Sequence, residues 1–358
     1  MVVNVVCLII PSLRHGGAER VISILANEWS RRPNLKVFII LLTKQEHFYS
    51  VNDNVTIIEP QEEYTSNLIS KFYYSIWILK FIRRTIRELK PDAVLSFCER
   101  YNNIVLLSLL GINVKRFVSD RNNPKNTLGL VHENLRKRLY KGADGIIAQT
   151  TTAKDILYIK TKNPNIKAIP NPLRNVEEHD VTKRENIILT VGRNVEQKNQ
   201  RELIEIFSRL EDAEHWKLEI IGVGDLRHEL ENLVEMKGLS NRVSFLDFQK
   251  NIDFYFQRAK IFVFTSLYEG FPNALIEAMA NGLPTVSYDC PTGPSELIVD
   301  GKNGDLVELN NTDLFVRKLQ FLINDDMLRN SYGEEAKNVK TKYSSQQISQ
   351  EYLNFILK

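Results

Sequence analysis

Residues 187–199 read Ile-Ile-Leu-Thr-Val-Gly-Arg-Asn-Val-Glu-Gln-Lys-Asn, an apolar run that meets a glycine and continues as a polar loop. A short branched apolar run bounded by glycine predicts a buried strand, here followed by a loop and a helix. In open parallel α/β sheets, ligands bind at the carboxyl ends of the strands. Arg193 and Lys198 follow this strand, and an arginine fork with a lysine point charge is a suitable clamp for a diphosphate. Alternatively, Arg193 and Lys198 only form salt bridges at the surface.

The same alternation of strands and helices extends through both halves of the chain. We expect a first sheet from strands at 3–10, 37–42, 93–97, 116–119 and 145–148, and a second from strands at 187–191, 218–221, 243–246, 261–264 and 285–288. A chain of 358 residues exceeds what one core normally supports. The pattern therefore predicts an α/β protein with two doubly wound Rossmann-like domains. We place them at 1–170 and 185–340, joined by a polar, proline-bearing linker at 171–184, with a final helix at 341–358 packing back on the first domain.

A second polar segment, Glu269-Gly-Phe-Pro-Asn-Ala-Leu-Ile-Glu277, carries two carboxylates across a predicted loop-to-helix junction. Pro272 suits the first turn of a helix, and Asn281-Gly282 suits its end, so we expect a helix from Asn273 to Asn281. Backbone amides at such a helix start, here those of Asn273 and Ala274, favour an anion such as phosphate. Ionised carboxylates accept paired hydroxyl donors, which a sugar and a ribose both offer. The alternative is an amphipathic helix with solvated glutamates.

These segments belong to an ordered set of motifs that spans nearly the whole chain. The set comprises Gly16-Gly17-Ala18-Glu19-Arg20, Gly192-Arg193 with Lys198-Asn199, Gly222-Val-Gly224-Asp225, Phe245-Leu246-Asp247, and the stretch from Thr265 to Pro284. With this order and spacing the chain resembles the retaining glycosyltransferases of family four. The resemblance implies the GT-B fold, in which two Rossmann-like domains face each other across a cleft. It further implies that the first domain binds the acceptor and the second the nucleotide sugar.

The resemblance also implies roles for individual residues. Arg193 and Lys198 would bind the donor diphosphate, Glu269 the transferred sugar and Glu277 the nucleotide ribose. The Gly16-Gly17 loop would let the backbone approach the phosphates and the reaction centre. The candidate catalytic residues are thus Glu269, Arg193, Lys198 and Gly17. The candidate donor-binding residues are Gly16, Gly17, Arg193, Lys198, Gly222, Phe248, Glu269, Phe271, Pro272, Asn273, Ala274 and Glu277.

The chain departs from the family at one position. Many relatives place a histidine near the transferred sugar, whereas this chain has Ser119-Asp120-Arg121-Asn122-Asn123-Pro124 there. Asp120 and Arg121 are the acceptor-side candidates that replace it. Arg121 would act electrostatically or by orientation, because an arginine does not lose its proton in proteins. A plain turn after the strand is the alternative, since asparagine and proline favour turns.

Charge is distributed unevenly along the chain. Residues 1–175 hold 26 Lys and Arg against 14 Asp and Glu, and the remainder holds 21 against 30. The segment 70–90 combines aromatic with basic residues, which suits a helix lying on an anionic membrane or gripping a lipid-linked acceptor. Its candidate residues are Lys71, Trp77, Lys80, Arg83, Arg84 and Arg87. The alternative is a helix that covers the sheet with solvated charges. No nucleic-acid motif accompanies the basic residues, so we expect no nucleic-acid partner.

Other sequence features narrow the class of protein. The apolar start 2–10 is too short to span a membrane and predicts a strand. Three scattered cysteines, Cys7, Cys98 and Cys290, indicate neither a disulfide framework nor a zinc site, as in a reducing compartment. The chain has no Asp-X-Asp motif, so we expect no metal and no cofactor. These features favour a cytoplasmic protein, peripheral at the inner face of the cell membrane.

Together these interpretations predict a metal-independent enzyme that transfers a hexose or N-acetylhexosamine with retention. The stretch Asp289-Cys-Pro-Thr-Gly-Pro-Ser-Glu296 is similar to bacterial enzymes of surface polysaccharide, lipopolysaccharide or lipid-linked oligosaccharide synthesis, which favours a UDP-sugar donor and a glycan or polyprenyl-diphosphate-linked sugar acceptor. A GDP-mannose-dependent mannosyltransferase, a sugar-nucleotide epimerase of the same fold and a non-catalytic sugar-binding protein remain alternatives. A nicotinamide-dependent dehydrogenase is disfavoured, because Arg227 replaces the third glycine of the dinucleotide fingerprint.

Overall fold

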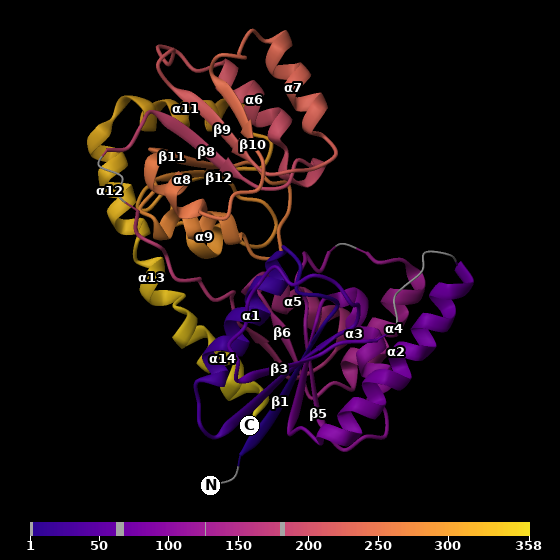
Figure 1. The fold of residues 1–358 in the computed structure, drawn as a ribbon. Helices are drawn as coiled ribbons and strands as arrows, with labels where there is room; N and C mark the ends of the chain where they lie inside the picture. Colours follow the sequence, from indigo (N-terminus) through magenta and orange to yellow (C-terminus); the bar gives the residue numbers. More distant parts are fainter. Residues whose placement is uncertain (1–2, 62–67, 126, 180–182) are drawn as a thin grey trace. The chain divides into compact units, whose positions relative to one another are not determined.

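The computed structural model describes residues 3–61, 68–125, 127–179 and 183–358, which form two compact units. Unit 1 comprises residues 1–172 together with 345–358, and unit 2 comprises residues 173–344. Each unit has its own parallel sheet, its own helices on both faces and its own buried core (Figure 1). The predicted pair of doubly wound Rossmann-like domains is therefore confirmed.

The sheet of unit 1 has the strand order β3-β2-β1-β4-β5-β6-β7. Neighbouring strands pair in parallel throughout. The chain begins in the middle of the sheet at β1, moves outward to β3, and then crosses to β4 on the other side of β1. The strands are β1 Asn4–Ile10, β2 Leu35–Leu41, β3 Val55–Ile58, β4 Ala93–Phe97, β5 Lys115–Ser119, β6 Gly145–Ala148 and β7 Ile166–Ala168.

Helices cover both faces of this sheet because successive side chains of its strands point to opposite sides. In β1, Val6, Leu8 and Ile10 pack on one face with α1 and α14. Cys7 and Ile9 pack on the other face with α2 and α3, and α4 and α5 extend that second layer. The helices are α1 Gly17–Ser30, α2 Leu68–Leu89, α3 Glu99–Ser108, α4 Leu130–Lys141, α5 Thr151–Thr161 and α14 Ser345–Ile356.

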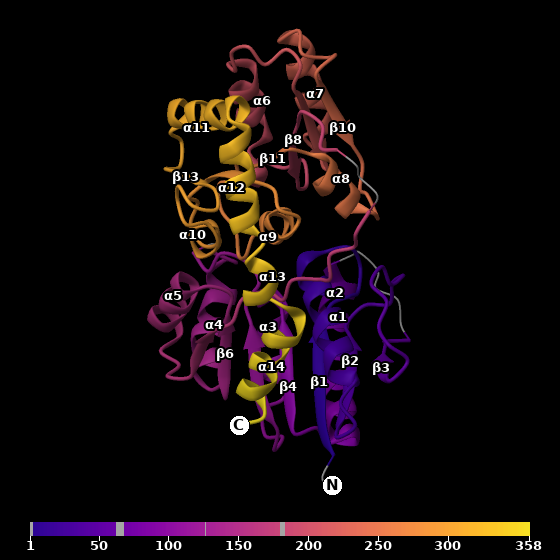
Figure 2. The ribbon, with the colours of Figure 1, turned by 90° about the vertical axis from the view of Figure 1, so that its left-hand side faces the viewer.

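The C-terminal helix α14 is part of unit 1, far in sequence from the rest of it. It lies along α1 (Figures 1 and 2), where the Trp29 indole donates to the Ser349 carbonyl at 2.9 Å. Ile348, Tyr352 and Ile356 on its apolar face are fully or almost fully buried in the core shared with α1 and β1. This helix closes one face of the sheet.

The sheet of unit 2 has the order β10-β9-β8-β11-β12-β13, again with parallel pairs. Its strands are β8 Ile187–Val191, β9 Lys217–Ile221, β10 Val243–Leu246, β11 Ile261–Phe264, β12 Thr285–Tyr288 and β13 Asp305–Val307. Its helices are α6 Gln200–Ser208, α7 Arg227–Met236, α8 Ile252–Arg258, α9 Asn273–Ala280, α10 Pro294–Leu297, α11 Thr312–Asn324, α12 Asp326–Ala336 and α13 Val339–Lys342, with a 3-10 turn at Glu196–Lys198.

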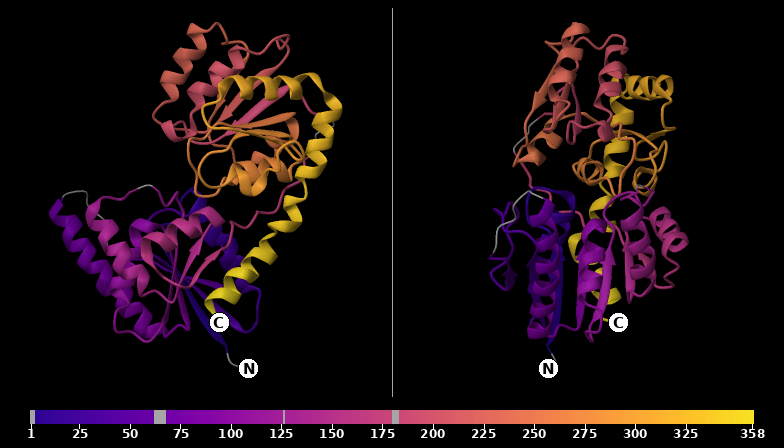
Figure 3. Two further views of the ribbon diagram at one scale, coloured as in Figure 1. Left: turned by 180° about the vertical axis from the view of Figure 1, so that it is seen from behind. Right: turned by 90° about the vertical axis from the view of Figure 1, so that its right-hand side faces the viewer.

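Two helical layers enclose this second sheet, as the view from behind in Figure 3 also shows. Helices α6, α7 and α11 pack on one face against residues such as Ile188, Ile220 and Val263. Helices α8, α9 and α13 pack on the other face against Leu189 and Phe262. The two cores meet the sheet on its opposite sides, which is the doubly wound arrangement.

The boundaries of the units differ in detail from the predicted domains. Residues 173–179 and 183–184, which the sequence places in a linker, lie within unit 2. Arg174 binds the Asp253 carboxylate with both terminal nitrogens, and Arg184 donates to the carbonyls of Phe256, Ala259 and Asn281. Residues 341–344 also stay with unit 2, so α14 starts at Ser345.

Truncation of Ile356 tests the docking of α14. The side chain is fully buried, so Ile356→Ala should lower the free energy of unfolding by about 2–5 kcal/mol through lost burial and a cavity. Urea unfolding followed by tryptophan fluorescence measures this, because Trp29 lies at the contact. Gln346→Ala, at an exposed position of the same helix, is the control and should change stability by less than about 0.5 kcal/mol. Equal stability of the two variants would contradict the docking.

Candidate functional site

The candidate site of unit 2 lies where the strand order of its sheet reverses, between β8 and β11. Strands β8 and β11 are neighbours, but the chain leaves β8 towards β9 on one side and leaves β11 towards β12 on the other. In such sheets the carboxyl ends of the two strands at this reversal are the usual ligand site. Lys198 follows β8 and Glu269 follows β11. The topology brings these two predicted site residues together.

Lys198 and Glu269 form an ion pair in which Nζ of Lys198 lies 2.6 Å from Oε1 of Glu269. Both side chains are largely buried, with 18% and 9% of their surface exposed. The ammonium also lies 5.3 Å from the centre of the Phe264 ring, at the end of β11. Buried charges need a partner, and here each of the two compensates the other. The pair leaves a cation and an acceptor-only carboxylate side by side at the ligand edge.

The loops that carry this pair are joined by hydrogen bonds. The Thr265 hydroxyl donates to the Lys198 carbonyl at 3.0 Å, and the Leu267 amide donates to the Gln197 carbonyl at 2.8 Å. In return, the Gln197 side-chain amide donates to the Tyr268 carbonyl at 2.8 Å. The spacing between the two charged groups is therefore set by backbone contacts as well as by their own attraction.

A third loop, after β12, holds the backbone of Glu269. The Thr292 hydroxyl donates to the Glu269 carbonyl, and Thr292 adopts a positive φ of 65°, which a non-glycine residue rarely does without tertiary support. Nearby, burial raises the pKa of the Cys290 thiol to about 12, and the Glu269 carboxylate acts in the same direction. Cys290 is thus a neutral thiol near pH 7 and is unsuited to act as a nucleophile. Thr292 was not among the predicted site residues.

Helix α9 begins as predicted, with a difference at its first turn. Pro272 is the N-cap residue rather than a residue of the first turn. The Asn273 amide donates to the Phe271 carbonyl at 3.0 Å, so it is not available to an anion as predicted. Among the described residues, Ala274 is the predicted amide that retains this capacity, since amides of a first turn lack an intrahelical acceptor. Phe271 is buried and packs towards Tyr343, which supports the loop.

Glu277 lies one turn further along α9 and is 5% exposed. Its carboxylate Oε2 lies 3.6 Å from Nε of Arg174, which also binds Asp253 at 2.6 and 2.7 Å. Sequence reasoning missed both Arg174 and Asp253. They lie 103 and 24 positions from Glu277, and only the fold brings the three together.

The other predicted donor residues lie along the same edge of the sheet. Arg193 is exposed, and within the described ranges its guanidinium has no ion-pair partner. Gly222 has a φ of +150°, and a Cβ atom there would stand 2.0 Å from the Gly192 carbonyl oxygen. The loops after β8 and β9 can approach this closely because Gly222 has no side chain. Phe248 follows β10 and is 45% exposed.

Gly16 and Gly17 lie at the equivalent edge of unit 1. Gly16 is the N-cap residue of α1, with an extended backbone, and Gly17 is the first residue of that helix. The corresponding reversal in the strand order of this sheet lies between β1 and β4, and these glycines follow β1 at that reversal. The glycine loop is thus placed at a ligand edge, and its role in donor binding stays a prediction.

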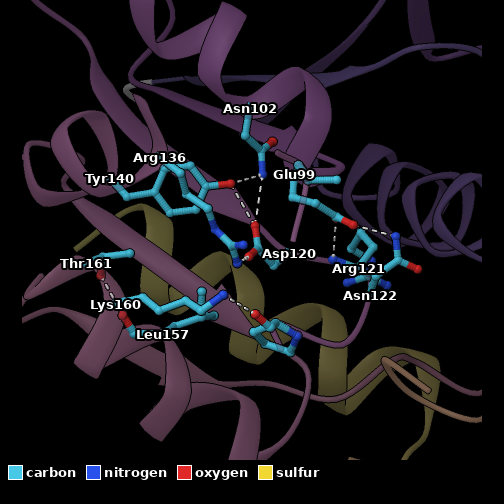
Figure 4. A network of polar contacts seen from close by, with 12 residues as sticks. Glu99, Asn102, Asp120, Arg121, Asn122, Arg136, Tyr140, Leu157, Lys160 and Thr161 are labelled. Atoms are coloured by element: carbon cyan, nitrogen blue, oxygen red, sulfur yellow. Dashed lines mark hydrogen bonds and ion pairs between the residues drawn. The ribbon is translucent and has the colours of Figure 1, made fainter. Parts of the chain in front are cut away.

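Asp120 and Arg121 lie within a buried polar network of unit 1 (Figure 4). Asp120 is 3% exposed, forms an ion pair with Arg136 and accepts a hydrogen bond from the Tyr140 hydroxyl at 2.7 Å. Burial, followed by the Asp120 charge, raises the pKa of Tyr140 well above its usual value. Asn102 donates to the same hydroxyl at 2.8 Å. These contacts favour a structural role for Asp120.

Arg121 connects the end of β5 to distant parts of unit 1. Its terminal nitrogens donate to the Tyr352 hydroxyl of α14 at 3.1 Å and to the Asn171 side chain at 2.5 Å. Its backbone amide donates to the Glu99 carboxylate at 3.3 Å. Arg121 is 9% exposed, and its role towards an acceptor stays a prediction.

The basic helix α2 divides into buried and exposed residues. Trp77 is half-buried and stacks between Tyr74 and Phe81, at 5.7 and 5.1 Å, against the core. Arg83 donates to the Ser108 and Leu110 carbonyls at 2.9 and 2.7 Å, and so satisfies the end of α3. These two residues therefore serve the fold. The exposed basic candidates are Lys80, Arg87 and Arg84, the last paired with Glu88, while the Lys71 side chain lies outside the described residues.

The residues that the structure describes have two further properties. They contain no group of three or more His, Cys, Asp or Glu residues placed to hold a metal ion. Among the helices that the structure describes, none combines the length and the apolar character needed to cross a bilayer. The three cysteines are free.

The chain is similar to known glycosyltransferases. Residues 174–339 match the model of the family described as glycosyl transferases group 1. The chain is 28% identical over 340 residues to an uncharacterized glycosyltransferase of Haemophilus influenzae, covering 94% of this chain and 95% of that one. It is 29% identical over 364 residues, with 98% of both chains covered, to the N-acetylgalactosamine-N,N'-diacetylbacillosaminyl-diphospho-undecaprenol 4-alpha-N-acetylgalactosaminyltransferase of Campylobacter jejuni. Among solved structures, Anabaena HepE in complex with UDP-glucose has the same fold, with a TM-score of 0.81, 17% identity and 98% of both chains covered.

The two parallel-sheet units have the GT-B fold, which the chain shares with HepE. The protein is a glycosyltransferase, and its unit 2 carries the region that matches the glycosyl transferases group 1.

Replacement of Gly222 tests the close approach of the loops at the site. Gly222→Ala should lower the free energy of unfolding by about 3 kcal/mol, because the new methyl group meets the Gly192 carbonyl. Gly238→Ala is a matched control: Gly238 also has a positive φ, +68°, but nothing lies within 4 Å of its Cβ position. The control should lose only about 1–2 kcal/mol, the cost of the left-handed backbone. Equal losses in denaturant unfolding would refute the close contact.

Proposed function

We propose that this protein is a retaining glycosyltransferase of family four that transfers a hexose or N-acetylhexosamine from a UDP-sugar without a metal ion. Its acceptor is a glycan or a polyprenyl-diphosphate-linked sugar of bacterial surface polysaccharide synthesis. The observation that carries the proposal is the Lys198–Glu269 pair, 2.6 Å apart at the reversal point of the unit 2 sheet. It offers a cation for a diphosphate next to an acceptor for sugar hydroxyls.

Three further observations support this choice of donor and acceptor. The exposed Arg193 guanidinium, which has no ion-pair partner among the described residues, lies on the same loop as Lys198 and adds a second cation for the diphosphate. The relative from Campylobacter jejuni is named for an acceptor linked to undecaprenyl diphosphate. HepE, which shares the fold, was solved with UDP-glucose.

The proposed reaction proceeds by attack of an acceptor hydroxyl oxygen on the anomeric carbon of the donor. A new bond forms between that oxygen and the anomeric carbon, and the bond from the anomeric carbon to the phosphate oxygen breaks. The departing phosphate oxygen takes the hydroxyl proton. Lys198, Arg193 and the α9 amide of Ala274 stabilise the charge that develops on the diphosphate. Glu269 orients the sugar through its hydroxyls rather than forming a covalent bond.

The acceptor would be met at a membrane, for which unit 1 offers a surface. Helices α2 and α4 both start at the carboxyl edge of the sheet and flank α3 (Figures 1 and 3). Apolar side chains are exposed there: Tyr73 by 67%, Leu130 by 85% and Val131 by 72%. Exposed apolar side chains with basic neighbours suit an anionic lipid surface. This surface replaces the predicted one in part, because Trp77 and Arg83 are committed to the fold.

A panel of nucleotide sugars tests the function. A ligand that binds the native state raises the melting temperature, so UDP-sugars should raise it and GDP-sugars should not. Incubation of the active donor with and without polyprenyl-diphosphate-linked sugars, in the presence of EDTA, should give an acceptor-dependent α-linked product. A product without acceptor indicates an epimerase, selective stabilisation by GDP-mannose indicates a mannosyltransferase, and loss of activity in EDTA contradicts metal independence.

Substitutions of the charged residues test their roles. Arg193→Ala should weaken donor binding about 10- to 100-fold, the value of one or two charge-assisted hydrogen bonds. Glu269→Gln should lower kcat about 100-fold or more while the fold is kept. Titration calorimetry and initial rates measure the two effects. Glu196→Gln, an exposed carboxylate on the loop of Lys198, is the control and should leave both unchanged. Normal binding and turnover in both site variants would contradict the assignment.

Introduction of two aspartates at the start of α4 tests the proposed membrane surface. Leu130→Asp with Val131→Asp should reduce co-sedimentation with phosphatidylglycerol vesicles about tenfold or more, because burial of one such side chain contributes about 1.5–3 kcal/mol. The fold should tolerate the change, since acidic residues suit the first turn of a helix. Met236→Asp, at a 77% exposed position of unit 2, is the control. Unchanged vesicle binding of the double variant would exclude this surface.

A further inference from the structure

We infer that Arg174 is a positioning residue that sets the Glu277 carboxylate for the ribose of the donor, and so determines the preference of the enzyme for ribonucleotides. This inference rests on the proposed function, in which Glu277 binds the ribose hydroxyls. Arg174 lies in the segment that leads into unit 2 and is outside every motif of the sequence analysis.

Asp253 fixes the orientation of the Arg174 guanidinium independently of Glu277. Its two terminal nitrogens donate to the two oxygens of Asp253 at 2.6 and 2.7 Å, a bidentate geometry with one preferred orientation. Asp253 is 2% exposed and accepts two more hydrogen bonds, from the Glu177 amide at 2.8 Å and the Asn281 side chain at 2.9 Å. Burial opposes ionisation of Asp253, but the bonds from Arg174 and Glu177 outweigh it and lower its pKa.

With both terminal nitrogens held, the remaining Nε of Arg174 faces the Glu277 carboxylate, 3.6 Å from Oε2. The same assembly holds the backbone of Glu277, because the Asn281 side chain donates to the Glu277 carbonyl at 2.9 Å. Asp253 and Asn281 thus tie the arginine and the glutamate to one framework. A lysine could supply the charge but not this fork.

The position of Glu277 on α9 explains how the orientation of its carboxylate can affect binding of a ligand. Glu277 and Asn273 are four residues apart on α9, so they share a face of the helix whose first turn lies at the ligand edge. A carboxylate has about four acceptor positions, so the contact with Arg174 does not by itself exclude hydrogen bonds from ribose hydroxyls. The positive charge of Arg174 also compensates a carboxylate that is 5% exposed.

The test compares UDP with 2′,3′-dideoxy-UDP, which lacks the two hydroxyls. The measured quantity is the ratio of the two dissociation constants, obtained by titration calorimetry with the full-length enzyme. Loss of charge at position 174 affects both diphosphates alike and cancels in this ratio, as does a general loss of stability. The wild-type protein should prefer UDP about tenfold or more. Glu277→Gln and Arg174→Gln should both bring the ratio close to one, and Arg174→Lys should give an intermediate value.

Arg258→Gln is the matched control, because Arg258 forms a comparable ion pair with Glu219 in the same unit and its side chain is similarly exposed. It should leave the ratio at the wild-type value. If the wild-type protein does not distinguish UDP from 2′,3′-dideoxy-UDP, or does not bind UDP, then the ribose assignment of Glu277 is wrong and this inference fails with it. Discrimination that is lost in Glu277→Gln but kept in Arg174→Gln overturns the inference alone. Should Arg174→Gln fail to fold, Arg174→Lys decides: a wild-type ratio overturns the inference.

Discussion

Parallel pairing of β8 with β11, with the chain leaving the two strands in opposite directions, is the constraint on which the candidate site depends. The constraint brings the loops after β8 and β11 to the same carboxyl edge of the sheet, which is the usual ligand edge of such sheets. Lys198 and Glu269 meet there although they are 71 positions apart. Their ion pair, together with Thr265 and Thr292, holds three loops in register at this edge of the sheet.

Buried charges have different consequences in the two units. In unit 1, Asp120 and Arg136 are deeply buried and engaged with each other, so loss of either partner would leave an uncompensated charge, at a cost of about 3–5 kcal/mol. In unit 2, the Lys198–Glu269 pair is more exposed and lies at the carboxyl edge of the sheet, so under the proposed function a diphosphate and a sugar would compete for its two members. The same type of contact is thus closed to solvent in one unit and accessible in the other.

The central strands of both sheets are predictable because burial on both faces makes them continuous apolar runs. Strands β4, β6, β8, β10, β11 and β12 occur at the predicted residues. The edge strands β3, β7 and β13 were not predicted. β7 and β13 have three residues each, and β3 and β7 are only partly buried, so their apolar signal is weak. Apolar patterning reports burial, which is lower in such edge strands, although the edge strand β10 was predicted.

The sequence by itself determined the alternation of strands and helices, the division into two sheets and the polar residues that follow each central strand. These properties are local, because they depend on runs of a few residues and on the glycines and prolines that end them. The partners of those residues were decided only by the tertiary structure. Arg174, held by Asp253, lies beside Glu277, Arg121 donates to Tyr352, and Trp77 of a basic helix packs against the core. Such contacts join residues tens to hundreds of positions apart. The chemical type of a side chain does not specify which distant group will neutralise or bury it.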